Sequence, residues 1–182
     1  MAGRFGDINL TKYDDLFKNE ETRQAEKQEQ VLEVPADQIF PYARQPYFWG
    51  GKSDAIGWDN RWGQLYEVTA ADSPTTGTYR PYGMDCSGYV DWAFNNALGY
   101  IIGHGGGAMM QHTYCTDIAW DEAQIGDLAF YPDDEHVGIV AGWDESGNIL
   151  IVHCASGYNN VVITAKEGFT SVSRPDIFTE DA

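Results

Sequence analysis

The amphipathic segment that follows Asp85 limits most strongly what this chain can fold into. Gly99 is suited to ending a helix there, and Asp85 is suited to capping its first turn. Between them, apolar side chains recur at the spacing of one buried helical face: Val90, Ala93, Phe94, Ala97 and Leu98. The spacing predicts a helix over residues 86–98, with Cys86 on its first turn.

Three short apolar runs follow this helix, and each has the length of a β-strand. They cover residues 127–131, 136–143 and 148–155, with residues 161–164 as a fourth candidate. Short strands joined by polar turns are typical of an antiparallel meander. A helix followed by such a meander predicts an α+β fold.

The second and third runs form a β-hairpin if residues 144–147 are its turn. In that register Trp143 lies opposite Asn148. Because side chains alternate along a strand, His136 and His153 then share one face of the hairpin as diagonal neighbours. A turn of odd length or a bulge would place the two histidines on opposite faces.

The charge balance excludes several classes of partner. The chain has 28 acidic and 11 basic residues, a net charge of −17. Binding to nucleic acid or to an anionic membrane surface depends mainly on Lys and Arg, so we expect neither. The longest apolar runs are too short to cross a bilayer, and residues 1–15 lack the apolar region of a secretory signal. We therefore expect no membrane insertion and no export signal in this sequence.

Polarity also divides the chain. Residues 1–46 carry 6 basic and 9 acidic groups, whereas residues 47–182 carry 5 and 19. Residues 11–30 are almost wholly polar and offer no core face, which is typical of a solvated helix or a disordered arm. We expect a polar N-terminal arm over residues 1–40 and one globular domain over residues 41–182.

Cys86 and two histidines supply the parts of a thiol nucleophile. The start of a helix favours a thiolate, His136 can take the proton, and His153 can orient that imidazole. The N–H of Cys86 can contribute to an oxyanion hole. The charge of Asp85 opposes thiolate formation, so His136 must lie close. The acidic run at residues 133–135 is most simply a solvated loop, and it can also raise the pKa of His136 or attract a cationic diamino-acid side chain.

Five short segments resemble, in order, the motifs of the NlpC/P60 cysteine peptidases. They are residues 46–51 (PYFWGG), 85–90 (DCSGYV), 126–131 (GDLAFY), 136–140 (HVGIV) and 152–156 (VHCAS). The resemblance extends from residue 46 to about residue 164 and implies a papain-like α+β fold. It also implies hydrolysis of peptidoglycan stem peptides, typically at the amide between D-glutamate and a diamino acid, without a metal or organic cofactor.

The same resemblance implies roles for single residues. Cys86 corresponds to the nucleophile, His136 to the general base and His153 to its orienting partner. Tyr47 corresponds to a tyrosine that helps to hold the oxyanion or the substrate backbone.

Two further residues and an insert complete this comparison. Asp85 and Ser87 flank the nucleophile and are candidates for contacting the amino end of the substrate. Residues 52–84 form a longer link between the first two motifs than is usual in the family. This insert can be a lid or groove wall that narrows the substrate range, or a surface elaboration.

A short segment near the N-terminus resembles another family. Residues 31–41 (VLEVPADQIFP), followed by Gln45 and Pro46, resemble the opening of ParB-type partition proteins. Neither the core of those proteins nor their helix-turn-helix follows. We therefore expect no DNA-binding function from this segment.

Several alternatives stay open at the level of sequence. The chain can be an active cysteine endopeptidase, or an inactive relative that binds the cell wall or a partner. Cys86, His136 and His153 can also be metal ligands, although zinc ligands are usually more closely spaced in sequence. Cys115 and Cys154 are expected to be structural, and they can pair if the protein is exported. We expect a monomer that acts on peptidoglycan peptides at the cell wall or outside the cell.

Overall fold

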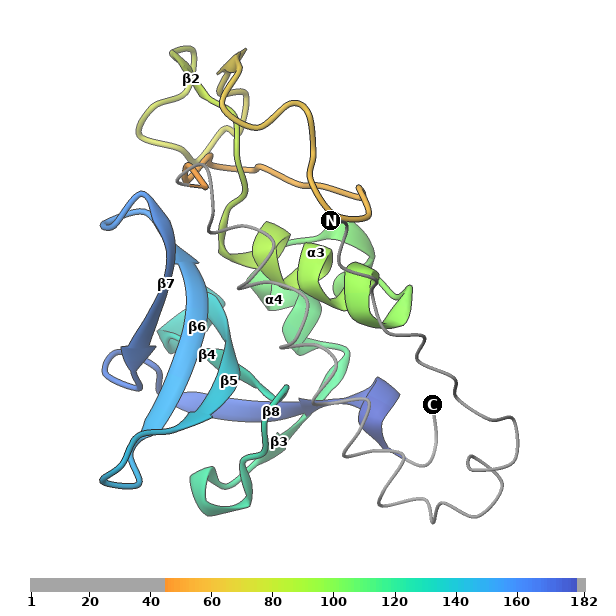
Figure 1. Ribbon diagram of the computed structural model, residues 1–182, viewed down its shortest axis with the longest axis vertical. Coiled ribbons are helices and arrows are strands. Elements are labelled where there is room, and N and C mark those ends of the chain that lie inside the picture. The colour runs from red at the N-terminus through yellow and green to blue at the C-terminus, as the bar shows by residue number, and fades with distance from the viewer. Residues whose placement is uncertain (1–44, 180–182) are drawn as a thin grey trace, which may run out of the picture.

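A six-stranded antiparallel sheet and one long helix form the centre of the structure (Figure 1). The computed structural model describes residues 45–179. The predicted N-terminal arm, the domain boundary near residue 41 and residues 31–41 of the ParB-like segment therefore lie outside the described residues. The strand order is β3-β8-β4-β5-β6-β7, and each neighbouring pair is antiparallel. The predicted α+β fold is confirmed.

The elements have the following bounds. The strands of the main sheet are β3 (Cys115–Ile118), β4 (Leu128–Phe130), β5 (Val137–Trp143), β6 (Ile149–Ala155), β7 (Asn160–Ala165) and β8 (Ser171–Pro175). A separate hairpin contains β1 (Leu65–Glu67) and β2 (Tyr79–Pro81). The α-helices are α3 (Cys86–Leu98) and α4 (Ala108–His112), and the 3₁₀ turns are η2 (Ile102–Gly105), η3 (Trp120–Glu122), η4 (Pro132–Asp134) and η5 (Asp176–Phe178). Over residues 45–179, none of these helices is long and apolar enough to span a bilayer.

Helix α3 begins and ends where its sequence predicts. The carboxylate of Asp85 accepts a hydrogen bond from the Gly88 N–H, and Gly99 adopts a left-handed conformation with φ 66°. Apolar side chains of α3 pack against the sheet in one cluster, which includes Phe94 and, from β4, Leu128. Every residue from 86 to 94 is buried, so this part of α3 has no solvent-exposed face. The first turn, which carries Cys86, is thus held rigidly against the core.

The β5–β6 hairpin has a different turn from the predicted one. Trp143 pairs with Ile149 rather than with Asn148. Residues 144–148 therefore form a five-residue connection, and the prediction of a four-residue turn is wrong. Asp144 closes the turn by donating its N–H to the Asn148 carbonyl at 2.9 Å.

A bulge cancels the effect of the extra turn residue before the strands reach the histidines. The pairing shifts by one around residue 141, and beyond it Ile139 lies opposite Val152. This is the pairing that the four-residue turn would have produced. A turn with an odd number of residues moves each side chain of the following strand to the other face of the sheet, and a bulge does the same. The two together therefore return the side chains to the predicted faces. His136, which directly precedes β5, therefore lies on the same face as His153.

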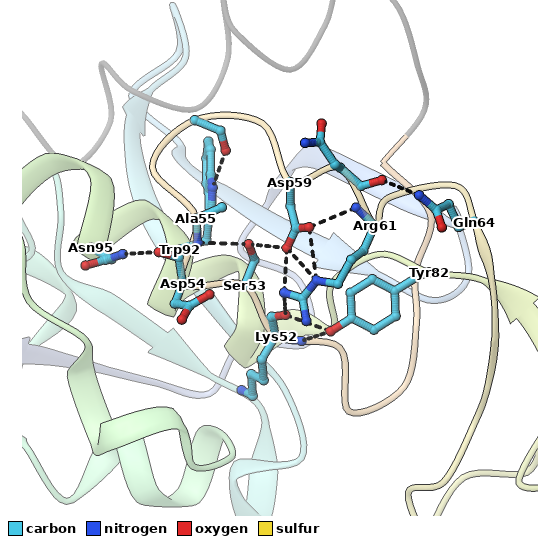
Figure 2. A network of polar contacts seen from close by, with 12 residues as sticks. Lys52, Ser53, Asp54, Ala55, Asp59, Arg61, Gln64, Tyr82, Trp92 and Asn95 are labelled. Atoms are coloured by element: carbon cyan, nitrogen blue, oxygen red, sulfur yellow. Dashed lines mark hydrogen bonds and ion pairs between the residues drawn. The ribbon is translucent and has the colours of Figure 1, made fainter.

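The insert at residues 52–84 is tied to α3 by a polar network (Figure 2). The indole N–H of Trp92 in α3 donates to the Gly57 carbonyl at 2.9 Å. Within the insert, Arg61 pairs with Asp59, and this hydrogen bonding lowers the pKa of the Asp59 carboxyl to about 2. The insert thus packs on the helix that carries Cys86, while its β1–β2 hairpin lies apart from the main sheet (Figure 1).

Gly88 gives a test of this arrangement. A Cβ atom at Gly88 would lie 2.0 Å from the Gly51 carbonyl oxygen. We expect Gly88→Ala to lower the free energy of unfolding by about 2 kcal/mol, because backbone has to move apart, even though alanine favours helix. Gly157→Ala is the control, since no atom lies within 4 Å of its added Cβ. Urea denaturation that gave both variants equal stability would contradict this packing.

Candidate active site

Cys86 lies at the start of α3, with its side chain nearly closed off from solvent. The residue is 8% exposed. Burial and the charge of Asp85 raise the pKa of its thiol to about 11, although hydrogen bonds from the backbone amides of Val137 and Ser87 act in the opposite direction. Burial thus outweighs the expected effect of the helix terminus, and the resting form is a thiol. The contact with Val137 also shows that β5 begins against the sulfur.

Two histidines form a direct hydrogen bond beside this strand start. His136 Nε2 lies 2.7 Å from His153 Nδ1. The other nitrogen of His153, Nε2, lies 3.0 Å from the hydroxyl oxygen of Thr164 on β7. His136 directly precedes Val137, whose amide reaches the Cys86 sulfur. The prediction that the two histidines share one face is confirmed.

The direction of these hydrogen bonds follows from counting protons. The Thr164 hydroxyl donates its one proton to the Ala165 carbonyl at 3.0 Å, so its oxygen accepts from His153 Nε2–H. His153 Nδ1 is then an acceptor and receives the Nε2–H of His136. This leaves His136 Nδ1 with a lone pair, which is the form a general base needs. Sequence patterns did not single out Thr164. On β7, Val162 is the residue that pairs with His153, and Thr164 lies two residues further along the strand.

Both histidines are held in their neutral form. Burial lowers the pKa of His136 to about 4, with a further contribution from His153, and burial lowers the pKa of His153 to about 4. The expectation that the acidic run at residues 133–135 raises the pKa of His136 is therefore wrong. Asp134 instead pairs with His112 at 2.8 Å.

Aromatic rings account for the burial of the pair. The ring of Tyr131 lies 4.9 Å from that of His136, and the ring of Phe169 lies 5.3 Å from that of His153, measured between centroids. These rings exclude water from one side of the imidazoles. An apolar wall of this kind penalises the charged imidazolium, which explains the low pKa values.

Tyr47 borders the same site. Its backbone bridges to Met84, and its N–H donates to the Asn159 side chain at 2.8 Å. Burial raises the pKa of the Tyr47 phenol, and the charges of Cys86 and Asp85 raise it further. The phenol is therefore within electrostatic reach of the thiol and keeps its proton, so it is able to act as a hydrogen-bond donor.

Asp85 and Ser87 are both engaged by a cation from this chain. Lys52 Nζ lies 2.6 Å from Ser87 Oγ and 3.6 Å from Asp85 Oδ1. It also lies 3.4 Å from Asp91, a buried carboxylate one turn along α3 whose pKa burial raises to about 6. Lys52 was not predicted. A signal for it exists in the sequence, because it directly follows the PYFWGG segment in a domain with few cations.

The remaining cysteines lie in structural positions. Cys115 donates to the Gln111 carbonyl, and the buried Cys154 donates to the Met84 carbonyl at 3.2 Å. All three cysteines are free, so no Cys115–Cys154 disulfide is present. Within residues 45–179, no group of three or more His, Cys, Asp or Glu side chains is arranged to hold a metal ion.

A comparison with models of known protein families identifies the family of this chain. The model of the NlpC/P60 family matches residues 44–171. The chain belongs to the NlpC/P60 family. This is a family of cysteine peptidases, and the residues matched include all five segments identified in the sequence. No curated protein matches the chain significantly.

Solved structures of NlpC/P60 proteins have the same fold. The peptidoglycan hydrolase RipB from Mycobacterium tuberculosis is 25% identical over 84% of this chain and 66% of the RipB chain, with a TM-score of 0.58. The P60 domain of an antigen from Mycobacterium avium subspecies paratuberculosis is 23% identical over 84% of this chain and 96% of that domain, with a TM-score of 0.57. This NlpC/P60 protein thus spans about two thirds of the length of RipB. The predicted papain-like NlpC/P60 fold is confirmed.

The protonation pattern of the histidines gives a second test. An unperturbed histidine, with a pKa near 6.5, is mostly charged at about pH 5.5. We expect His136 and His153 to stay neutral at that pH, both protonated at Nε2, and to titrate only near pH 4. Imidazole ¹⁵N shifts recorded against pH measure both the charge and the tautomer.

His112 serves as the internal control. Despite some burial, hydrogen bonds to Asp117 and Asp134 raise its pKa, so it remains charged at pH values where the buried pair is neutral. Titration of all three rings together near pH 6.5 would contradict the proposed electrostatics.

Proposed function

We propose that this protein is a cysteine endopeptidase that hydrolyses peptidoglycan stem peptides at the amide between D-glutamate and a diamino acid. The observation that carries the proposal is the directed chain from Thr164 through His153 to His136, which ends in an unprotonated nitrogen next to the strand start that contacts Cys86. The family relationship and the likeness to RipB, a peptidoglycan hydrolase, support the choice of substrate.

The first half of the reaction uses the proton arrangement of the resting site. The pKa of the Cys86 thiol is about 11 and that of His136 about 4, so a free thiolate–imidazolium pair is unfavourable. The proton therefore moves from sulfur to His136 Nδ1 as the sulfur attacks the carbonyl carbon. The N–H of Cys86 and the hydroxyl of Tyr47 donate to the resulting oxyanion, while His153 Nδ1 accepts from the imidazolium.

The second half returns every group to its starting state. His136 gives its proton to the leaving amine, the C–N bond breaks, and a thioester to Cys86 remains. A water molecule then loses a proton to His136 and attacks the thioester carbonyl. Release of the carboxylic acid product restores the thiol and the neutral imidazole.

Asp85 and Ser87 are proposed to contact the amino end of the substrate. Both already bind the ammonium of Lys52, at 3.6 and 2.6 Å. An amino group on the substrate would have to displace that of Lys52, whereas an acylated amino end leaves the pair undisturbed. A substrate with a free amino end therefore makes this contact only at the expense of the Lys52 pairing.

Replacement of the nucleophile tests the proposed function. We expect Cys86→Ala to lower the rate of stem-peptide hydrolysis by at least about 1,000-fold, because no other group can form the thioester. Mass spectrometry of defined muropeptides under reducing conditions identifies the bond that is cut. Cys115→Ser is the matched thiol control and should retain activity. Wild-type protein that cuts no muropeptide, or a Cys86→Ala variant as active as wild type, would refute the proposal and favour the inactive binding module.

Thr164 is proposed as a positioning residue for the histidine pair. Thr164→Val keeps the shape but removes the acceptor of His153 Nε2–H, so the tautomer that serves His136 is no longer fixed. We expect kcat to fall by about 10-fold with little change in KM, while Thr164→Ser restores the rate. The wild-type rate should persist to about pH 5 and fall near pH 4, where the pair becomes protonated. A valine variant with unchanged kcat and pH profile would show that Thr164 has no such role.

A further inference from the structure

A cleft of about 360 Å³ opens beside Tyr47 and is not used by the mechanism above. Its walls come from residues 46–49, from residues 68–81 of the insert, and from Ser156 and Asn159 in the turn between β6 and β7. Tyr47 therefore borders both the cleft and the nucleophile. A peptide whose scissile amide lies at Cys86 can extend past Tyr47 into this space. The volume lies within the range of pockets that hold small ligands.

Arg80, on β2, supplies a positive charge to the wall of this cleft. Among the cations of residues 45–179, most are neutralised: Lys52 lies by Asp85 and Asp91, Arg61 by Asp59, and Arg174 by Asp127. Lys166 lies over the Trp120 ring, 4.6 Å from its centroid.

Within the same part of the chain, no carboxylate pairs with Arg80. The one hydrogen bond that its side chain makes within residues 45–179 runs from Nε to the Thr78 hydroxyl at 3.3 Å, which leaves both terminal nitrogens of the guanidinium available to a ligand. Among the five lysines and arginines of residues 45–179, Arg80 is thus the one that lies by neither a carboxylate nor an aromatic ring. A guanidinium presents paired N–H donors that match a carboxylate.

The other walls are largely apolar. Trp49, which is 37% exposed, and Val68 line the cleft together with the prolines at positions 46, 74 and 81. The guanidinium of Arg80 is itself exposed, so it can bind a carboxylate while these walls cover the rest of the peptide. The cleft thus combines one cation with surfaces that fit the aliphatic part of a peptide.

We propose that this cleft is a subsite for a free carboxylate of the substrate peptide and that Arg80 is the residue that selects it. The inference rests on the proposed function for the identity of the peptide. A γ-D-glutamyl–diamino acid segment carries two such groups, the α-carboxylate of D-glutamate and the terminal carboxylate of the diamino acid. The excess of acidic residues in the domain repels both, so selection of either requires a local cation.

Binding to the Cys86→Ala variant tests the subsite without turnover. Three peptides with acylated amino ends are compared by calorimetry: the parent with both carboxylates, one with the D-glutamate α-carboxamide, and one with the terminal carboxamide. We expect one of the two amidated peptides to bind about 10-fold more weakly than the parent, and that peptide identifies the carboxylate that is read. The preference should shrink at high salt because Arg80 is exposed.

Substitutions in the same background assign the effect to one side chain. Arg80→Gln should remove the preference, because it weakens binding of the parent peptide about 10-fold. It should leave unchanged the affinity for the amidated peptide that binds wild-type Arg80 poorly. Arg80→Lys keeps the charge without the paired donors and should give an intermediate value. Lys166→Gln changes the net charge equally at a site away from the cleft and should leave the preference intact. Thermal melting checks that each variant is folded.

The outcomes separate this inference from the proposed function. Equal affinity for all three peptides, or an Arg80→Gln variant that weakens all of them alike, overturns the subsite. If wild-type protein cuts the parent and both amidated peptides equally, the endopeptidase function stands and the carboxylate subsite fails. If no peptide is cut but the preference that depends on Arg80 is present, the subsite stands and the proposed hydrolysis fails.

Discussion

The carboxylate of Asp85 holds together the elements on which the candidate site depends. It caps α3 through the Gly88 N–H and also accepts from the Gly50 N–H, which fixes residues 46–51 against the helix. The close approach of the Gly51 carbonyl to Gly88 leaves no room for a side chain there. The segment that carries Tyr47 and the turn that carries Cys86 are thus positioned by one side chain and one backbone contact. The cost is electrostatic, because the same carboxylate raises the pKa of the Cys86 thiol.

Burial then decides how the proposed chemistry operates. The site keeps a protonated thiol and two neutral imidazoles. A preformed ion pair would instead place two charges in a region from which aromatic rings exclude water. A neutral resting site needs hydrogen bonds to set its tautomers, because no charge orients the rings. The Thr164 hydroxyl supplies that orientation from the next strand, so the sheet itself, through the β6–β7 pairing, determines which nitrogen of His136 is free.

The sequence predicts those parts of the fold that have strong local signals. Helix α3 is predicted to the residue, since Asp85 and Gly99 have the chemistry of its two ends. Strands β3 and β8 lie far apart in sequence yet pair at one edge of the sheet, and no local pattern reports such a pairing. The facing of His136 and His153 was predicted through a turn of the wrong length, and it holds because the bulge compensates. Thr164 and Lys52 depend on tertiary contacts, so sequence patterns alone did not identify them.

The distribution of charge connects the insert to the site. Lys52 and Arg80, the cations nearest to Asp85 and to the cleft, both belong to residues 52–84, where the chain departs from the usual family pattern. The rest of the domain is strongly acidic, and the proposed substrate, peptidoglycan with its associated polymers, is largely anionic, so long-range attraction would not supply its recognition. On the proposed function, recognition then has to come from contacts at close range, such as that of Arg80 with a substrate carboxylate. The two cations of the insert therefore differ in what they can do: Lys52 is already paired with Asp85 and Asp91 at the nucleophile helix, whereas Arg80 is left to make the proposed contact in the adjoining cleft.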